Sequence, residues 1–189
     1  MRRSAFIVVF FGALVLGVSL RADTFKVDPV HSFVVFKIGH LDVGYVWGEF
    51  ASPAGTITID DSDASKSAIN VEIKSDNLVT TNEARNKHLK SPDFFDVKQF
   101  PTISFKSTAV KKTADKTYEV SGDLTLHGVT KPLTLTLNKL AEGDKGAMFG
   151  YRAGFEADFS VRRSDFGMTS LMNVVGDEVK LFVNLEGTK

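Results

Sequence analysis

Apolar side chains recur at every second position in a series of short segments that covers most of the chain after residue 22. In residues 69–73, for example, Ile69, Val71 and Ile73 alternate with polar residues. Gly, Pro, Asp, Asn and Lys separate the segments, as expected for turns. A period of two is typical of strands with one buried and one solvated face, and a long antiparallel series of them tends to close on itself. The alternation therefore predicts an all-β fold that encloses an interior.

The first long segment carries large apolar residues on both of its faces. Phe33 and Val35 alternate with an opposite face that holds Ser32, Val34, Phe36 and Ile38. This strand is therefore predicted to be covered on its outer side or to lie near a dimer contact. Pro53 and Gly55 are expected to break or bulge the next strand. The other predicted strands are residues 46–50, 56–60, 69–73, 103–110, 118–126, 133–137, 149–159 and 179–185.

The N-terminus has the three-part form of a secretory signal peptide. Arg2 and Arg3 precede an apolar stretch over residues 5–20, and the small residue Ala22 precedes a polar start at Asp23. Residues 1–22 are therefore predicted to be a signal peptide, and residues 23–189 a single domain that is periplasmic or secreted. The alternative is a retained anchor, but the apolar stretch is shorter than the about 20 residues that usually span a bilayer. We expect cleavage, and no stable membrane span after it.

Charge and cysteine content exclude several classes of protein. Removal of Arg2, Arg3 and Arg21 lowers the number of basic residues from 23 to 20, against 23 acidic residues, for a net charge of −3. The longest basic run of the remaining chain is Lys111–Lys112, so nucleic acid is not an expected partner. The chain contains no cysteine and cannot form a disulfide. The fold must therefore be stabilised by packing and by hydrogen bonds between strands.

Two stretches do not read as strands. Thr80 and Glu83 have the spacing of a capping box, and Ser91 before Pro92 marks a helix end, which predicts one short helix over about residues 81–90. Residues 163–177 hold several large apolar side chains without a period of two. We predict a lid-like loop there.

Several motifs together resemble the YceI-like family. They are DPVHS at residues 28–32, FKIGH at 36–40, GEF at 48–50, RNKHLKSPDFFD at 85–96, FPTISF at 100–105, GDLTLHGVTKP at 122–132, RSDFG at 163–167 and GDEV at 176–179. They occur in family order and span nearly the whole chain after residue 22. The resemblance implies a lipocalin-like, eight-stranded antiparallel β-barrel that holds a long isoprenoid or similar lipid. It also implies an exported bacterial protein with no established catalytic reaction, and a possible homodimer.

The aromatic content suits a tunnel but also a filled core. A barrel of about eight strands is wide enough either to be packed by its own side chains or to hold one slender ligand. Residues 23–189 contain 13 Phe, and rings and thioethers are good walls for an apolar tunnel. Strand phase, bulk and presence in a matching motif predict a ligand-binding wall of Val34, Phe36, Ile38, Trp47, Phe50, Ile73, Phe94, Phe105, Phe155 and Phe166.

Two arginines in the motif blocks are candidates for a polar head group. Arg85 and Arg163 each lie near aromatic residues, and a guanidinium suits phosphate or carboxylate oxygens. We therefore include both in the predicted ligand site. The alternative is an arginine–carboxylate pair that ties the helix or the loop to the barrel, with Asp93 or Asp165 as the local partner.

The resemblance to the YceI-like family favours a carrier, store or scavenger of isoprenoid-type lipids, with no cofactor other than the bound lipid. A first alternative is an enzyme or metal protein that uses the four histidines, His31, His40, His88 and His127. None of them has the close spacing of a zinc site, and no nucleophile elbow or phosphate loop is present, so we expect no enzyme. A second alternative is an envelope interaction module whose barrel is solid.

Overall fold

The structure is a computed structural model that describes residues 22–189. The predicted signal peptide thus lies outside the described residues, except for Ala22. The strands are β1 Asp23–Val27, β2 Phe33–His40, β3 Gly44–Ala51, β4 Ala54–Ile59, β5 Ala68–Lys74, β6 Leu78–Val79, β7 Thr102–Ala114, β8 Thr117–Leu126, β9 Val129–Asp144, β10 Tyr151–Arg162 and β11 Val175–Thr188. The helical elements of this part of the chain are the α-helix α1 Glu83–Leu89 and the 3₁₀ turns η1 Ala64–Lys66, η2 Ser75–Asn77 and η3 Arg163–Phe166.

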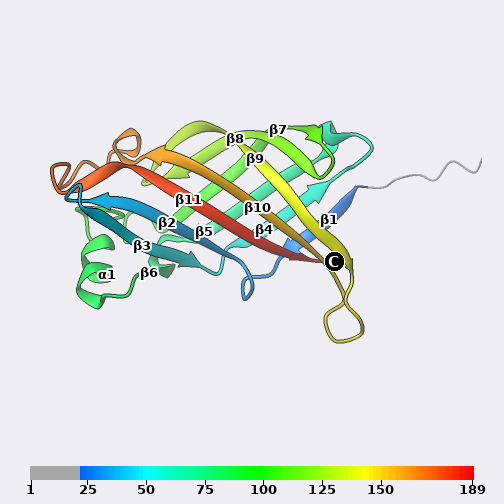
Figure 1. Cartoon of the computed structure of the whole chain (residues 1–189), viewed down its shortest axis with the longest axis horizontal. Helices are drawn as coiled ribbons and strands as arrows, with labels where there is room; N and C mark the ends of the chain where they lie inside the picture. The colour runs from blue at the N-terminus through cyan, green and yellow to red at the C-terminus, as the bar shows by residue number, and fades with distance from the viewer. Residues whose placement is uncertain (1–21) are drawn as a thin grey trace, which may run out of the picture.

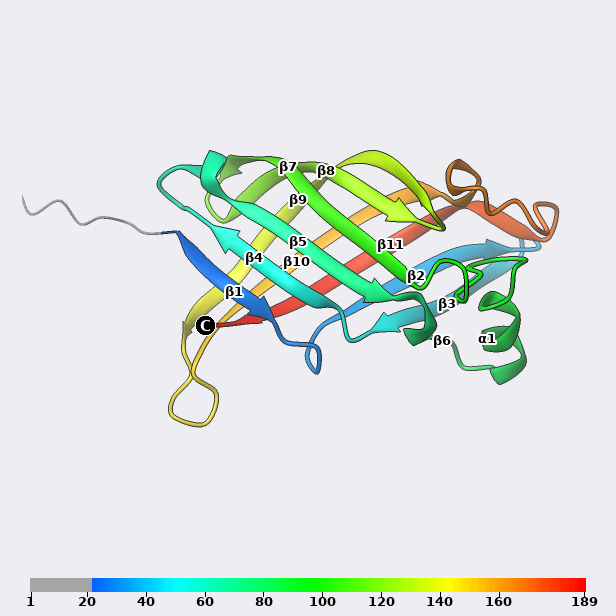
Figure 2. The ribbon, with the colours of Figure 1, turned by 180° about the vertical axis from the view of Figure 1, so that it is seen from behind.

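The strands form a closed antiparallel barrel, as predicted (Figures 1 and 2). The ring runs β1-β4-β5-β7-β8-β9-β10-β11 and closes where β11 pairs with β1. Strand β2 continues along the same edge of β11 beyond β1, and β3 and β6 follow outward from β2. The ring therefore has eight strands, and β2 and β3 lengthen it at the end where α1 lies.

The break predicted after residue 50 separates β3 from β4. Strand β3 ends at Ala51, and β4 resumes at Ala54 after Pro53. Ser52 has a positive φ of 57°, and Gly55 has a φ of 140°. A Cβ on Gly55 would lie 2.0 Å from the Asn70 carbonyl oxygen, so only glycine fits this close approach. Because of this break, β4 can pair within the closed ring while β3 pairs with β2 at the extended end.

The barrel is solid at the end away from α1. Phe25, Ile57, Tyr118 and Phe155 are each completely buried there, within one cluster of apolar side chains. The rings of Phe25 and Phe155 meet edge to face, with centroids 5.8 Å apart. This packing closes one end of the barrel without a disulfide, since the chain has no cysteine.

The predicted helix is present, but its predicted cap is wrong. Helix α1 begins at Glu83, and the Asn82 side chain caps it by accepting a hydrogen bond of 2.9 Å from the Arg85 amide. Thr80 instead donates its hydroxyl to the side chain of Asn86. At the other end, the Ser91 hydroxyl donates to the His88 carbonyl at 2.7 Å. Asparagine caps a helix as well as threonine does, so spacing alone did not fix the first turn.

The predicted lid-like loop lies between β10 and β11, at the same end of the barrel as α1 (Figure 1). It starts with η3 and reaches β11 at Val175, so strand structure begins two residues before the predicted end. The Leu41 amide in the β2–β3 hairpin donates to the Val174 carbonyl at 2.7 Å, which ties the two loops together. Among the described residues, no helix has the length and apolar character needed to cross a bilayer.

Candidate ligand-binding cavity

The half of the barrel nearest α1 is hollow. It contains a cavity of about 480 Å³ whose lining is mostly apolar. The walls come from both sides of the ring, because inward-facing residues of β2, β5, β7, β8, β9, β10 and β11 all contribute. The predicted interior therefore combines both alternatives, a packed core at one end and a cavity at the other.

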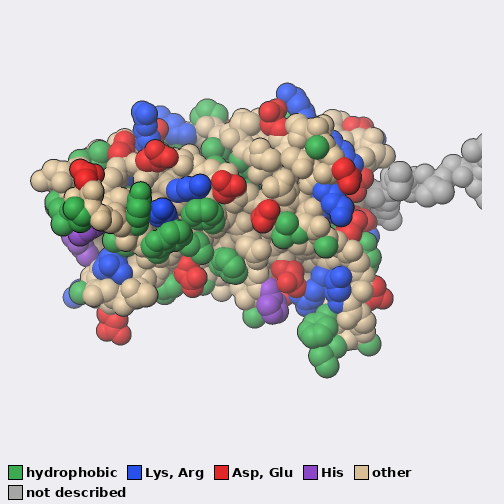
Figure 3. Space-filling model, viewed as in Figure 1, with side chains coloured by type: hydrophobic (Ala, Val, Ile, Leu, Met, Phe, Trp, Pro, Cys, Tyr) green, Lys and Arg blue, Asp and Glu red, His purple; other side chains and the backbone are tan. Residues whose placement is uncertain are grey.

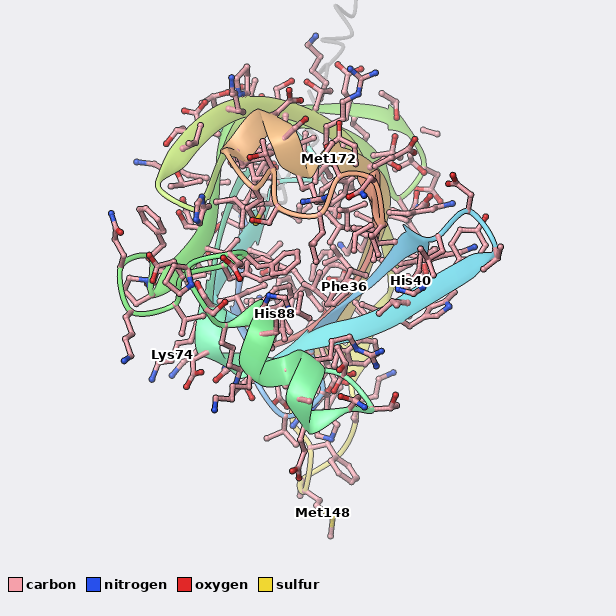
Figure 4. The ribbon with its side chains drawn as sticks, turned by 90° about the vertical axis from the view of Figure 1, so that its left-hand side faces the viewer. Phe36, His40, Lys74, His88, Met148 and Met172 are labelled. Carbon is pink, nitrogen blue, oxygen red and sulfur yellow. The ribbon has the colours of Figure 1, made fainter. Side chains whose placement is uncertain are left out.

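Most of the predicted wall residues line this cavity. They are Val34, Phe36, Ile38, Phe50, Ile73, Arg85, Phe94, Phe105 and Arg163. The strand residues share the inward phase of their segments, and α1 and the segment that follows it bring Arg85 and Phe94 over the end of the barrel. Figure 4 looks into this end, with Phe36 and His88 near the middle of the view and His40 on the β2–β3 side. Contact with a ligand remains a prediction for all of them.

Trp47 was predicted in the wall but lies on the outside of the barrel. Half of its side chain is exposed, and its ring stacks on Phe182 with centroids 5.9 Å apart. Lys37 lies over the neighbouring Tyr45 ring at 3.7 Å. Phe50 faces inward three residues later, and an odd separation along a strand places two side chains on opposite faces. Phe33, Tyr45 and Trp47 are exposed on this outer side, and Figure 3 shows green side chains with blue ones among them on the face that carries β2, β3 and β11.

Phe155 faces inward but does not reach the cavity. It belongs to the packed cluster at the solid end, where it contacts Phe25 and is completely buried. The strand phase of Phe155 was correct, whereas its position along the barrel axis was not. Its prediction as a wall residue is therefore corrected to a structural role.

Phe166 also lies outside the cavity lining. It is the last residue of η3, is almost completely buried, and packs with Leu124, Leu126 and Met168. It lines a second groove, which lies between β9 and β10. This groove shares part of its wall with the cavity.

Arg85 is placed to meet a polar group at the open end. Its Nε donates to the Thr80 hydroxyl at 3.0 Å, and Nη2 donates to the Thr81 hydroxyl at 3.3 Å. The alternative partner Asp93 instead contacts the His88 ring, with Nε2 3.0 Å from its carboxylate. The guanidinium of Arg85 thus lines the cavity with no carboxylate partner among the described residues.

Arg163 is held by hydrogen bonds to the backbone of the loop that it begins. Its guanidinium donates four hydrogen bonds of 2.8–2.9 Å, to the carbonyls of Met168, Ser170, Val175 and Gly176. The side chain is buried, and this burial lowers the pKa of Arg163 below its ordinary value. The alternative pair with Asp165 does not form. Arg163 therefore shapes the lid-like loop, and four of its five N–H donors are used there.

The four histidines lie in different places. His40 and His88 line the open end of the cavity, which the sequence did not predict. His127 is a turn residue beside Gly128, as predicted, and its Nδ1 lies 3.0 Å from the Phe166 carbonyl oxygen. In the described chain, the side chains close enough to share a metal ion are Asp28, His31 and Glu186. Arg152 donates to both of these carboxylates, so a guanidinium already balances their charge.

Other wall residues were missed although their phase was visible in the sequence. The additional apolar side chains of the lining include Val71, Leu133, Leu135, Leu137, Leu181 and Val183. They share the period of two with the predicted residues, but the prediction favoured aromatic bulk. The wall is largely aliphatic although several Phe rings line it, and the rings of Phe25, Tyr118 and Phe155 fill the solid end.

This geometry defines a closed antiparallel β-barrel with one solid end and one hollow, apolar end. Residues 25–187 match the family model of the YceI-like domain. The chain belongs to the YceI-like family.

Relatives and solved structures agree with this assignment. The chain is 39% identical over 181 residues to UPF0312 protein plu2095 of Photorhabdus laumondii, covering 94% of this chain and 93% of that protein. The crystal structure of Burkholderia cenocepacia BcnA has the same fold, with a TM-score of 0.77 and 22% identity over 86% of this chain and 99% of that one. A polyisoprenoid binding domain from Saccharophagus degradans also shares the fold, with a TM-score of 0.66 and 16% identity over 87% and 97% of the two chains.

Proposed function

We propose that this protein binds a long-chain isoprenoid or a related amphiphile in the hollow half of its barrel. It would act as a carrier, store or scavenger in the periplasm or outside the cell. The observation that carries the proposal is the apolar cavity of about 480 Å³ inside a rigid, laddered wall. The polyisoprenoid binding domain of Saccharophagus degradans supports the choice of ligand class, since the two chains share a fold.

The energetics favour a long hydrocarbon ligand. Each buried methylene group contributes about 0.8 kcal/mol, so a dozen of them give roughly 10 kcal/mol. Association and ordering cost about 4–15 kcal/mol, so a short chain would bind weakly. A preformed cavity keeps the ordering cost low, because the wall does not have to fold around its guest.

The few polar groups of the lining lie at the open end of the cavity. His40 and His88 face it there, and Arg85 lies beside His88 on α1. A guest with one polar end would therefore enter with its hydrocarbon first and leave the polar end near α1. This arrangement requires no bond to be made or broken, and we expect binding and no catalysis.

Export and assembly complete the proposal. The N-terminal pattern of two arginines, an apolar stretch and Ala22 supports a cleaved signal peptide. A lipid carrier outside the cytoplasm would shield a water-insoluble chain between membranes. The exposed apolar face around Trp47 is the surface on which we expect a homodimer, if one forms.

Extraction of the protein purified from its native host tests the function directly. Organic extraction followed by mass spectrometry is expected to recover a long-chain isoprenoid or related amphiphile in near-stoichiometric amount. Protein that carries no lipid, and that binds no added geranylgeraniol after delipidation, would contradict the proposal.

Two adjacent residues of β11 provide matched variants. Leu181 lines the cavity, whereas Phe182 stacks on Trp47 outside the barrel. Leu181→Trp fills part of the cavity and should weaken geranylgeraniol binding at least about tenfold, which is about 1.4 kcal/mol. Phe182→Trp places the same ring on the outer face and should leave binding unchanged. Circular dichroism checks that both variants are folded.

A further inference from the structure

The ladder between β9 and β10 covers only part of the two strands. Its register runs from Tyr151 opposite Asp144 to Glu156 opposite Asn138 and ends there. Beyond this point β9 continues to pair with β8 as far as Val129, and β10 continues to pair with β11 as far as Arg162. Residues 129–137 and 157–162 therefore belong to neighbouring strands without being joined by a ladder. The barrel wall is not sealed by hydrogen bonds at this place.

The sequence provides a physical reason for the missing ladder. Pro132 lies in the part of β9 that pairs with β8 but has no ladder to β10, and proline has no N–H to donate to a neighbouring strand. A register shift between Ala153 and Phe155 lies just before the ladder ends, and such irregularities bend a strand and increase its twist. Together they direct β10 away from the first half of β9.

A groove occupies the gap. Its sides are Lys131, Pro132 and Leu133 of β9 and Ser160, Val161 and Arg162 of β10. Leu124, Leu133 and Val161 line both this groove and the main cavity. The two spaces are thus separated by side chains and not by backbone ladders, so a rotation of those side chains would connect them.

Phe166 lies in this groove. Its ring is almost completely buried and packs on Leu124, with Leu133 and Val161 beside it. The carbonyl of Phe166 lies 3.0 Å from Nδ1 of His127 in the β8–β9 turn. Gly167 follows with a φ of 78°, and the next residue, Met168, is buried and lines the cavity. Phe166 thus closes the gap from a short turn, through the packing of its ring and the hydrogen bond of its carbonyl with His127.

The rim of the groove carries four charged side chains that form no ion pair within residues 22–189. Lys131, Arg162, Asp165 and Glu178 all line it, and none of them takes part in the ion pairs found among residues 22–189. Two cations and two carboxylates offer both donors and acceptors without selecting one sign of charge. Such a rim suits the neutral or zwitterionic end of an amphiphile.

We propose that this groove is a side entrance to the cavity, closed by Phe166. An amphiphile would pass through it on the way to its final position, with its polar end crossing at the charged rim. The passage of a lipid rests on the proposed function. The existence of the entrance does not, because it depends only on the wall and on Phe166.

The reaction rate of an introduced thiol measures access through the entrance in the absence of a ligand. The chain has no cysteine, so a single one reports without background. Leu135→Cys places a thiol in the cavity wall, on the part of β9 that has no ladder to β10. Leu181→Cys places one on β11, where ladders join the strand to both of its neighbours. Each variant is treated with a cationic methanethiosulfonate reagent, with Phe166 present and with Phe166→Ala. Circular dichroism and thermal unfolding establish that every variant is folded.

Removal of the Phe166 ring should accelerate the reaction of only one of the two thiols. Phe166→Ala is expected to raise the reaction rate of the Leu135→Cys variant at least about tenfold, and that of the Leu181→Cys variant less than about twofold. Only Leu135 lies on a stretch of strand that has no ladder to its neighbour across the gap. His127→Ala keeps the ring of Phe166 but removes its anchor, and should also accelerate the Leu135→Cys variant. An equal acceleration at both positions, or none at either, would overturn the entrance.

Ligand exchange then tests passage. In Phe166→Ala, the association and dissociation rates of geranylgeraniol should both rise, while the equilibrium constant changes less than about threefold, because a faster route alters both directions alike. Unchanged rates would overturn passage through this gap. A protein that binds no isoprenoid at all would refute the proposed function and leave the thiol result standing.

Discussion

Tyr118 donates its phenol hydrogen to the carboxylate of Asp61, 57 residues away in the sequence, at the solid end of the barrel. Lys139 also reaches this carboxylate, with its Nζ 3.1 Å from Oδ2. Burial is the main cause that raises the pKa of Tyr118, and the hydrogen bond from Tyr118 lowers the pKa of Asp61 to about 2. The contact fastens the loop after β4 to β8 and β9.

Acid should weaken this contact in a defined range of pH. The pKa of Asp61 is below its ordinary value of 3.8 in the folded protein, so its carboxylate stabilises the fold above about pH 3.8. That contribution is lost as the pH falls towards about 2. Asp61→Asn should lower the melting temperature at pH 7, and the difference from wild type should shrink towards pH 2. As a control, Asp42→Asn removes a charge from the exposed β2–β3 turn and should leave the melting temperature at pH 7 unchanged. Equal melting temperatures for Asp61→Asn and wild type at pH 7 would contradict the prediction.

The two halves of the barrel should respond differently to truncation. Phe155→Ala leaves a void in a packed cluster and should lower the free energy of unfolding by about 3–5 kcal/mol. Phe105→Ala should cost less, since the ring borders a space that is already open. Urea denaturation measures both, and geranylgeraniol binding should change only for Phe105→Ala. Similar losses of stability in the two variants would argue against a hollow half.

Arg163 should matter for stability more than its neighbour. Arg163→Ala leaves four buried or partly buried carbonyls without a donor and should cost about 3 kcal/mol or more. Arg162→Ala removes an exposed guanidinium and should stay within about 0.5 kcal/mol of wild type. Hydrogen exchange over residues 167–175 should accelerate in the first variant alone. Unaltered protection there would show that the loop is held by other contacts.

Trp47 is the only tryptophan of the chain and should report on the outer face. Because half of its side chain is exposed, acrylamide should quench its fluorescence efficiently, and loading with geranylgeraniol should leave the emission wavelength unchanged. A blue shift on loading would place the ring in the cavity after all. Quenching that weakens as the protein concentration rises would support the predicted homodimer across this face.

Much of the fold was readable because the alternation is a local property. Residues 118–126 were predicted as a strand that the structure extends by one residue to Thr117. Strand β1 was missed although Phe25 and Val27 alternate with Thr24 and Lys26, because the alternation spans only five residues next to the apolar N-terminal stretch. Strands β9 and β11 are much longer than predicted, since their ends are polar and are ordered by ladders to distant residues.

The site was less predictable because it depends on position along the barrel axis. Strand phase separates inward from outward residues, and it would have excluded Trp47 had Phe50 been taken as the reference. Phase cannot distinguish Phe105 beside the cavity from Phe155 in the solid end, because the stagger of the strands sets their height. The partners of Arg163 are backbone carbonyls, which leave no mark on the sequence. Pro132 did mark the gap between β9 and β10, but its meaning required the strand order.

The separation of the barrel into a packed half and an empty half assigns anchoring and recognition to different residues. Phe25 and Phe155 stabilise the packed half, whereas Val34 and Leu181 line the cavity and could be replaced by larger or smaller side chains. Such remodelling would alter the girth of molecule that is accepted and leave the packed half intact. The same scaffold is thus suited to diversification, whether by evolution or at the bench.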